Sequence, residues 1–387
     1  MSATRALTCA FVLGTRPEAI KLAPVILEMQ RQPQAFLPLV WVTGQHRELI
    51  DQALETFGIL PDADFALMQP NQSHIALVGA ILSRLDSLIA THRLDWILVQ
   101  GDTSSALAGA LAGFFAGIPV AHVESGLRTY DLSAPFPEEG NRQIISRIAA
   151  LCCTPTATAG LNLLQERIPE SRIVQTGNTA VDAIHWVAKR HTALPVALDL
   201  WQNALRGRRW VLTTLHRRES FGAQLDGMLH AIRTLADDEN LNLAFIFPVH
   251  PNPSVKKSVY RILGNHPSIV LLPALKYPEL AAILAHSWIV LTDSGGLQEE
   301  GPSLKKPVLV LRDVTERPEG VETGAAELVG TDPSTIIDRV RQLASDPEIY
   351  YKMQNADNPY GDGHAASSIL RAIEAASAAH RVLTEHS

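Results

Sequence analysis

Residues 288–304 read WIVLTDSGGLQEEGPSL, an apolar strand-like run that stops at a DSGG turn and passes at once into a helical pattern. Glycines let the backbone approach a ligand closely, and the free N–H groups and dipole of a first helical turn favour an anion. We therefore expect a phosphate at Ser294, Gly295 and Gly296, with Glu300 one turn later holding ribose hydroxyls. The stretch is not a GxGxxG fingerprint, so a tight βα turn with solvated glutamates is the alternative.

A similar arrangement is predicted near the start of the chain. Apolar Leu7 to Leu13 indicates a buried first strand, and a helical pattern runs from Pro17 to Met29. Arg16 stands at the N-terminus of that helix, where its planar guanidinium offers paired donors to a phosphate, and Lys21 follows about one turn later. A surface arginine beside a turn is the alternative interpretation.

Short apolar runs recur along the whole chain, and each is followed by a helical pattern. Runs rich in Val, Ile and Leu that alternate with helices are typical of parallel sheets covered on both faces. The sequence contains two series of six runs: residues 7–14, 37–44, 96–101, 120–125, 151–155 and 173–177, then 210–216, 243–250, 269–273, 288–293, 308–312 and 327–330.

The length of 387 residues predicts two domains rather than one core. We predict an α/β protein of two doubly wound, Rossmann-like domains facing a cleft. Residues 1–180 with 365–387 form the N-terminal domain, and residues 181–364 form the C-terminal domain. The alanine-rich segment 365–382 is expected to be a helix that packs back on the first domain. Sheets of this kind bind ligands beyond the carboxyl ends of their strands.

Composition narrows the class of protein. Charged residues make up 19% and hydrophobic residues 46%, and the net charge of −7 argues against a nucleic acid or an anionic membrane as the main partner. The apolar runs have strand length and no signal-peptide pattern is present, so a cytoplasmic protein is expected. The three cysteines, Cys9, Cys152 and Cys153, lie in strand-like runs and are predicted to be buried free thiols.

Three carboxylates fall near predicted strand or helix ends: Asp102, Glu124 and Glu138. Each has a plainer explanation, because Asp102 could cap a helix, Glu124 could pair with Arg128, and Glu138 could open a helix. Together they suit acid/base chemistry, since burial and like-charge proximity raise a carboxyl pKa. The sequence shows no HExxH motif and no Cys/His cluster with ligand spacing, so we expect neither a metal nor another cofactor.

Eight short motifs then occur in one order. They are GTRPEAIK at 14–21, TGQHR at 43–47, GDT at 101–103, HVESGLR at 122–128, PEEGNR at 137–142, HRRE at 216–219, DSGG at 293–296 and TERPE at 315–319. This series resembles the non-hydrolysing UDP-N-acetylglucosamine 2-epimerases from residue 7 to about residue 375. The resemblance implies the two-domain GT-B fold, with the C-terminal domain binding UDP.

The resemblance also implies the reaction, a reversible C2 epimerisation of UDP-GlcNAc and UDP-ManNAc in which UDP is eliminated and re-added through a 2-acetamidoglucal. Residues carried over by matching motifs fall into two groups. Those expected to bind UDP are Arg16, Lys21, Ser294, Gly295, Gly296, Glu300 and Arg312, and those expected to be catalytic are Asp102, Glu124, Glu138 and His216.

Further expectations follow from the resemblance alone. Relatives bind a second UDP-GlcNAc as an activator, and the matching positions here are Gln45, His46 and Gln72. A homodimer and a role in cell-surface polysaccharide biosynthesis are also implied. The chain departs from many relatives at Gln100, where they have His, and from some at Leu215, where they have Gly.

Alternative functions stay open at this point. A GT-B glycosyltransferase would use the same UDP site to transfer the sugar to an acceptor. An epimerase of a related UDP-2-acetamido sugar would use the same chemistry, and a nucleotide-sugar sensor would need the phosphate site without the three carboxylates.

Overall fold

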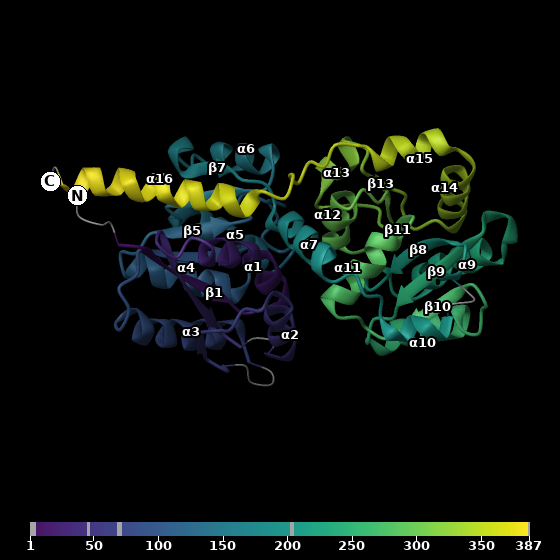
Figure 1. Ribbon diagram of the computed structural model, residues 1–387, viewed down its shortest axis with the longest axis horizontal. Helices are drawn as coiled ribbons and strands as arrows, with labels where there is room; N and C mark the ends of the chain where they lie inside the picture. Colours follow the sequence, from purple (N-terminus) through teal and green to yellow (C-terminus); the bar gives the residue numbers. More distant parts are fainter. Residues whose placement is uncertain (1–4, 45–46, 68–71, 202–204, 386–387) are drawn as a thin grey trace. The chain divides into compact units, whose positions relative to one another are not determined.

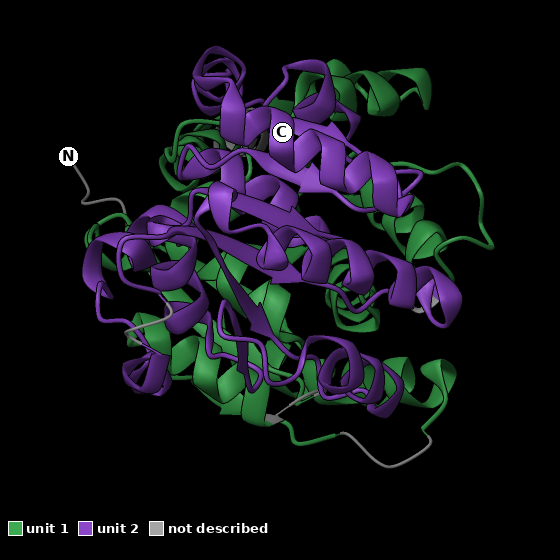
Figure 2. Cartoon of the chain, turned by 90° about the vertical axis from the view of Figure 1, so that its right-hand side faces the viewer, with its two compact units in different colours: residues 1–183, 361–387 green, residues 184–360 purple. Residues whose placement is uncertain are grey.

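The computed structural model describes residues 5–44, 47–67, 72–201 and 205–385 (Figure 1). The chain divides into two compact units (Figure 2). Unit 1 comprises residues 1–183 and 361–387, and unit 2 comprises residues 184–360. The division at residue 183 falls inside α7 (Thr179–Arg190), the helix that also contains the predicted join at residue 180.

Unit 1 is built on a parallel sheet, which has seven strands in the described residues, in the order β3-β2-β1-β4-β5-β6-β7. The strands are β1 (Leu7–Leu13), β2 (Phe36–Val42), β3 (Ala63–Asp64), β4 (Trp96–Gln100), β5 (Val120–Val123), β6 (Leu151–Thr154) and β7 (Ile173–Gln175). The helices are α1 (Arg16–Gln30), α2 (Arg47–Phe57), α3 (His74–Ile89), α4 (Ser104–Phe115), α5 (Glu138–Ile148), α6 (Ala157–Gln165) and α16 (Ala365–Glu385).

Unit 2 repeats the design with a parallel sheet in the order β10-β9-β8-β11-β12-β13. Its strands are β8 (Arg209–Thr214), β9 (Leu243–Pro248), β10 (Ile269–Leu272), β11 (Ile289–Thr292), β12 (Val308–Val310) and β13 (Ala326–Leu328). The helices are α9 (Ala223–Asp237), α10 (Pro253–Leu263), α11 (Tyr277–His286), α12 (Gly295–Ser303), α13 (Pro318–Glu322), α14 (Pro333–Ser345) and α15 (Pro347–Gln354).

The predicted fold class is confirmed. Each of the twelve predicted apolar runs contains a strand, and helices alternate with the strands in both units. Of the strands in the described residues, only β3 was not predicted, because it pairs two residues with the end of β2 and is too short to produce an apolar run.

Burial on both faces explains why the strands are continuously apolar. In β1, every residue from Cys9 to Leu13 is fully buried. Ala10 and Val12 point toward α3, α4 and α5, which pack side by side as one layer. Since neighbouring residues of a strand point to opposite faces, Phe11 and Leu13 are covered by the second layer, which contains α1, α2 and α16.

The α4 helix packs unusually close to this sheet. Its sequence, SSALAGALAGFF, is rich in small residues. A Cβ atom placed on Gly109 would lie 2.8 Å from Cγ1 of Val99 and 3.0 Å from Cβ of Val12. The helix backbone therefore rests directly on β1 and β4, the two strands whose following loops carry Arg16 and Asp102.

The C-terminal helix α16 returns to unit 1, as predicted, and packs against α1 and β6 (yellow in Figure 1). The carboxylate of Asp182 accepts hydrogen bonds from the N–H groups of Ala365 (3.2 Å) and Ala366 (2.9 Å) at the start of the helix. Further along, Ser377 Oγ accepts a hydrogen bond of 2.8 Å from the indole of Trp96 in β4. Polar contacts thus anchor α16 at two points.

The cysteines and the apolar segments match their predicted places. Cys9, Cys152 and Cys153 are buried and free, and burial raises the pKa of all three thiols. Among the described residues, no helix is both long enough and apolar enough to cross a membrane.

His122 is a polar residue within the core of unit 1. It lies in β5 and is fully buried. Its Nε2 atom is 2.8 Å from the carbonyl oxygen of Gly101, and because a carbonyl only accepts, Nε2 carries the proton. Burial lowers the pKa of His122 to about 3, so the ring is neutral in the folded protein.

The close packing of α4 generates a stability prediction. Gly109→Ala should lower the free energy of unfolding by about 1–3 kcal/mol, as is typical of overpacking, even though alanine is the better helix former. Gly79 in α3 is the matched control, because a Cβ atom there meets open space. Gly79→Ala should raise the free energy of unfolding by up to about 1 kcal/mol. Urea denaturation of both variants measures the effect, and a stabilised Gly109→Ala protein would contradict the packing argument.

The neutral His122 generates a pH prediction. Its folded pKa lies below the unfolded value of 6.5, so its contribution to stability is complete above pH 6.5 and is lost as the pH falls toward 3. The expected slope from this residue is up to about 1.4 kcal/mol per pH unit. His122→Gln keeps an amide donor and removes the titration. Urea denaturation from pH 7 to pH 4.5 should show a shallower decline for the variant, and parallel declines would contradict the assignment.

Candidate functional site

The site in unit 1 begins where the loops after β1 and β2 meet the start of α4. A Cβ atom on Gly14 would lie 2.0 Å from Oγ of Ser105 and 2.5 Å from Oγ1 of Thr43, so only glycine fits there. The two hydroxyl oxygens, of Thr43 and Ser105, are 2.8 Å apart. The loops are therefore packed directly together at the carboxyl edge of the sheet. Arg16 follows Gly14 as the first residue of α1, and its side chain is exposed.

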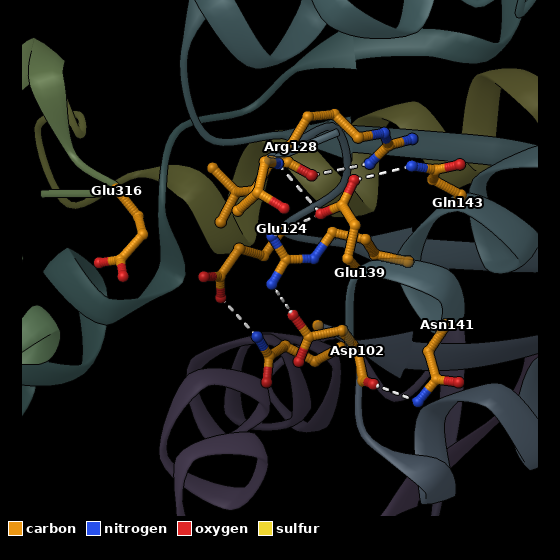
Figure 3. A network of polar contacts seen from close by, with 12 residues as sticks. Asp102, Glu124, Arg128, Glu139, Asn141, Gln143 and Glu316 are labelled. Atoms are coloured by element: carbon orange, nitrogen blue, oxygen red, sulfur yellow. Dashed lines mark hydrogen bonds and ion pairs between the residues drawn. The ribbon is translucent and has the colours of Figure 1, made fainter. Parts of the chain in front are cut away.

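Asp102 is positioned by α5. Its carboxylate forms an ion pair with the guanidinium of Arg142, and its backbone carbonyl accepts a hydrogen bond of 2.8 Å from the amide of Asn141 (Figure 3). The possibility that Asp102 caps α4 is wrong, because Thr103 is the capping residue, with Oγ1 accepting from the N–H of Ala106 at 3.0 Å. The side chain of Asp102 stays one quarter exposed, which leaves it accessible to a substrate.

Glu124 is positioned by cross-sheet contacts. It follows β5 in the left-handed backbone region, at φ 64°, and its side chain is only 7% exposed. Its Oε2 atom forms an ion pair with Nζ of Lys21 at 2.7 Å and accepts a hydrogen bond from the side-chain amide of Gln100. The alternative pairing of Glu124 with Arg128 is wrong, since Arg128 forms a two-point ion pair with Glu166 at 2.6 and 2.9 Å.

Lys21 and Gln100, two residues that the sequence analysis singled out, both contact the carboxylate of Glu124. Lys21 was expected to bind the nucleotide, and the structure places its ammonium group on Glu124. Gln100, at which the sequence analysis expects a departure from the family pattern, donates to the same oxygen. The departure from the family pattern therefore keeps a hydrogen-bond donor beside Glu124.

Glu138 is the first residue of α5 and is partly buried. It lies three and four residues before Asn141 and Arg142, which contact Asp102, so one helix connects the two carboxylates. The next residue, Glu139, is buried and accepts hydrogen bonds from the N–H groups of Thr129 and Tyr130. Burial raises the pKa of Glu139, but these bonds and the side chain of Gln143 outweigh it and lower the pKa.

In unit 2, Asp293 organises the DSGG turn of residues 293–296. It is fully buried, and its Oδ2 accepts the N–H groups of His216 (2.6 Å) and Arg217 (2.8 Å). Its Oδ1 lies 2.9 Å from Nδ1 of His216. One carboxylate thus fixes the loop after β8 and the orientation of the His216 ring, which is 35% exposed.

Ser294 precedes the first turn of α12, and Gly295 and Gly296 open the helix. A Cβ atom on Gly295 would lie 2.7 Å from Nη1 of Arg317. The guanidinium of Arg317 therefore stands against the start of α12, held by a 2.6 Å ion pair with buried Glu299. This places a fixed positive charge beside N–H groups that favour an anion.

Glu300 lies one turn inside α12 and is largely buried. Its side chain contacts the hydroxyl of Tyr277, and burial together with this carboxylate raises the pKa of Tyr277.

Arg312 belongs to the loop after β12. It forms ion pairs with Glu316 at 2.8 Å and with Glu219 at 3.4 Å. Burial raises the pKa of Glu316, but the hydrogen bond and charge of Arg312 outweigh burial and lower this pKa to about 2. Beside Arg312 is a small pocket of about 210 Å³, also lined by Glu219, Ser220, Gln224, Asp313, Val314 and Thr331.

Of the three residues expected to bind an activator, the structure describes one. Gln45 and His46 lie outside the described residues, and Gln72 is partly buried just before α3. Arg142, His122 and Arg317 lie within the sequence motifs, but the sequence pattern alone assigned them no role. The signal for Arg142 and Arg317 is an arginine inside a motif that also holds a carboxylate, although only the structure shows the partner.

Comparisons with known proteins identify the family. Residues 28–374 match the family model described as UDP-N-acetylglucosamine 2-epimerase. The UDP-N-acetylglucosamine 2-epimerase of Escherichia coli K12 is 44% identical over 371 residues, which cover 94% of this chain and 97% of the relative.

Two solved structures extend the comparison. The UDP-GlcNAc 2-epimerase of Neisseria meningitidis bound to UDP-GlcNAc has a TM-score of 0.85 and 40% identity, covering 95% of this chain and 100% of that chain. The enzyme of Methanocaldococcus jannaschii in complex with UDP-GlcNAc and UDP has a TM-score of 0.77 and 31% identity, with the same coverage. The motifs, the fold and these matches lead to one conclusion: the chain belongs to the UDP-N-acetylglucosamine 2-epimerase family.

Proposed function

We propose that this protein interconverts UDP-GlcNAc and UDP-ManNAc by eliminating and re-adding UDP through a 2-acetamidoglucal. The observation that carries the proposal is the placement of Asp102 and Glu124 at one edge of the unit 1 sheet. Each carboxylate is held by a cation from another element, Arg142 for Asp102 and Lys21 for Glu124. The relatives that share the fold include proteins solved with UDP-GlcNAc bound.

The chemistry explains why carboxylates and an anion site are needed together. The C2 hydrogen of the sugar is not adjacent to a carbonyl, so it is not acidic in the intact substrate. When the C1–O bond breaks, its electron pair leaves with UDP and positive charge develops at C1. A carboxylate then removes the C2 proton, and the former C–H pair becomes the C1–C2 double bond. UDP adds back to C1 while C2 receives a proton on the opposite face.

This sequence requires two acid/base groups, because the proton leaves one face of the ring and arrives on the other. Asp102, Glu124 and Glu138 supply them in the proposal. Asp102 and Glu124 follow different strands, and Glu138 opens α5, so the groups originate from separate elements. Contacts with Arg142 and Asn141 position Asp102, and contacts with Lys21 and Gln100 position Glu124.

The departing UDP needs compensation for its developing negative charge. We assign this role to the start of α12 at Ser294, Gly295 and Gly296, and to Arg16. Unit 2 is then the UDP-binding domain. His216, oriented by Asp293, assists at the pyrophosphate or sugar, and Glu300 accepts from the ribose hydroxyls. Arg312 acts through the loop that it braces by its ion pair with Glu316.

The test incubates the protein with UDP-GlcNAc alone in heavy water and follows the mixture by NMR. UDP-ManNAc that carries deuterium at C2 is expected, because a carboxyl proton exchanges with solvent before it returns. A glycosyltransferase or a sensor gives no epimer under these conditions. Asp102→Asn and Glu138→Gln should slow epimerisation by roughly 10²–10⁴-fold and leave UDP affinity nearly unchanged. Epimer without C2 deuterium would contradict proton abstraction.

Regulation by a second UDP-GlcNAc at Gln45, His46 and Gln72 is part of the proposal, in a homodimeric enzyme. The expected signature is slow turnover of UDP-ManNAc with a lag that disappears when a trace of UDP-GlcNAc is added. Gln72→Ala should weaken this activation while forward turnover of UDP-GlcNAc at saturation is retained. Hyperbolic kinetics without a lag, in the UDP-ManNAc direction, would exclude the activator.

A further inference from the structure

The short loop of residues 101–103 carries Asp102, and three side chains from other elements fasten it. His122 of β5 donates to the carbonyl of Gly101 at 2.8 Å. Asn141 of α5 donates to the carbonyl of Asp102, also at 2.8 Å. Glu18 of α1 accepts from the hydroxyl of Thr103 at 2.7 Å. Each residue of the loop is therefore fixed by a different element.

Glu18 also contacts a second loop, the one that follows β1. Its Oε2 atom accepts the N–H of Gly14 at 3.0 Å, whereas its Oε1 atom accepts from Thr103. One carboxyl group thus joins the turn that leads into α1, whose first residue is Arg16, to the loop of residues 101–103. The side chain is 1% exposed, so water does not compete strongly for these bonds.

The direction of these hydrogen bonds favours an ionised carboxylate. The N–H of Gly14 can only donate. Oγ1 of Thr103 accepts the N–H of Ala106 at 3.0 Å, which leaves its own proton for Glu18. Both oxygens of Glu18 are therefore acceptors, a role that a carboxylate fills without a proton.

Burying the carboxylate of Glu18 costs the free energy of removing a charge from water. The two groups that donate hydrogen bonds to Glu18, the hydroxyl of Thr103 and the N–H of Gly14, are both uncharged. Burial raises the pKa of Glu18 to about 7, and these hydrogen bonds offset the effect only in part. A neutral side chain of similar volume would fill the space without the desolvation of a charge. Core packing alone gives no reason for this residue type.

We propose that Glu18 is a positioning residue of the reaction, which holds the loop of Arg16 and the loop of Asp102 in one fixed relation. The inference rests on the proposed function, in which Arg16 stabilises departing UDP while a carboxylate such as Asp102 exchanges the C2 proton. Both events belong to one elimination, so an error of about 1 Å between the two groups can cost about 10²-fold in rate.

Glu18→Gln tests the role with almost no change in volume. The amide NH₂ must face either the N–H of Gly14, where two donors oppose, or the hydroxyl of Thr103, which must then give up its present geometry. One of the two loops is released in either case. We expect kcat to fall by about 10–100-fold, with KM for UDP-GlcNAc and the Kd for UDP within about threefold of the wild type.

The partner residue provides a second route that does not depend on the Glu18 variant. Thr103→Ser keeps the hydroxyl and should retain the wild-type kcat, whereas Thr103→Val removes it and should lower kcat. If the two residues act as one link, the double variant Glu18→Gln/Thr103→Val should be no slower than the poorer single variant. Rates are measured well below the unfolding temperature of each protein, as established by thermal denaturation.

Asp182→Asn is the matched control for loss of a buried carboxylate. Asp182 is also buried in unit 1 and accepts two backbone N–H groups, at the start of α16. This variant should lose stability while kcat stays unchanged. A folded Glu18→Gln protein with wild-type kcat, or one in which only KM rises, overturns the positioning role, as does a wild-type kcat for Thr103→Val.

Asp102→Asn, assayed in parallel, separates this inference from the proposed function. If Asp102→Asn retains the full rate, the catalytic assignment itself fails. If Asp102→Asn is slow and Glu18→Gln is not, only the role of Glu18 fails. A slow Asp102→Asn variant together with reduced kcat for Glu18→Gln supports both.

Discussion

Parallel strands buried on both faces leave little room for polar chemistry except where the strands end, and this constraint organises both units. The interior of β1 is fully buried between two layers of helices, so a charged group inside the sheet would lose its hydration. Polar residues therefore gather in the loops that follow the strands. Because all strands of a unit point the same way, these loops collect at one edge, and residues far apart in sequence become neighbours there.

The two units use buried carboxylates in the same manner. In unit 1 the carboxylate of Glu139 receives the N–H groups of Thr129 and Tyr130, and in unit 2 the carboxylate of Asp293 receives those of His216 and Arg217. Each therefore acts as a brace that connects a loop to another element. His216, which is proposed to meet the substrate, is thus held by a carboxylate that does not meet it, which is how a site keeps its geometry before a ligand arrives.

Local features of the sequence predicted most of the fold. Apolar runs located twelve strands, and the glycine turn before Leu297 located the start of α12, because both signals lie within a few adjacent residues. Pairing could not be predicted in the same way. Lys21 and Glu124 are 103 positions apart, and Asp102 and Arg142 are 40 apart, so their contacts depend on the order of strands in the sheet. The ion pair between Glu124 and Arg128, which their closeness in sequence favoured, does not form. Glu124 has a left-handed backbone conformation, and its side chain pairs with Lys21 instead.

The return of α16 to unit 1 has a consequence for the order of folding during synthesis. Unit 2 is continuous, so its sheet can be completed as soon as residues 184–360 have left the ribosome. Unit 1 is made first but finishes last, because the helix that covers α1 and β6 follows residue 360. Until Ala365 reaches Asp182 and Ser377 reaches Trp96, apolar surface on unit 1 stays uncovered. The nascent chain therefore depends on α16, which is made after unit 2, to cover a unit whose other elements are made before unit 2.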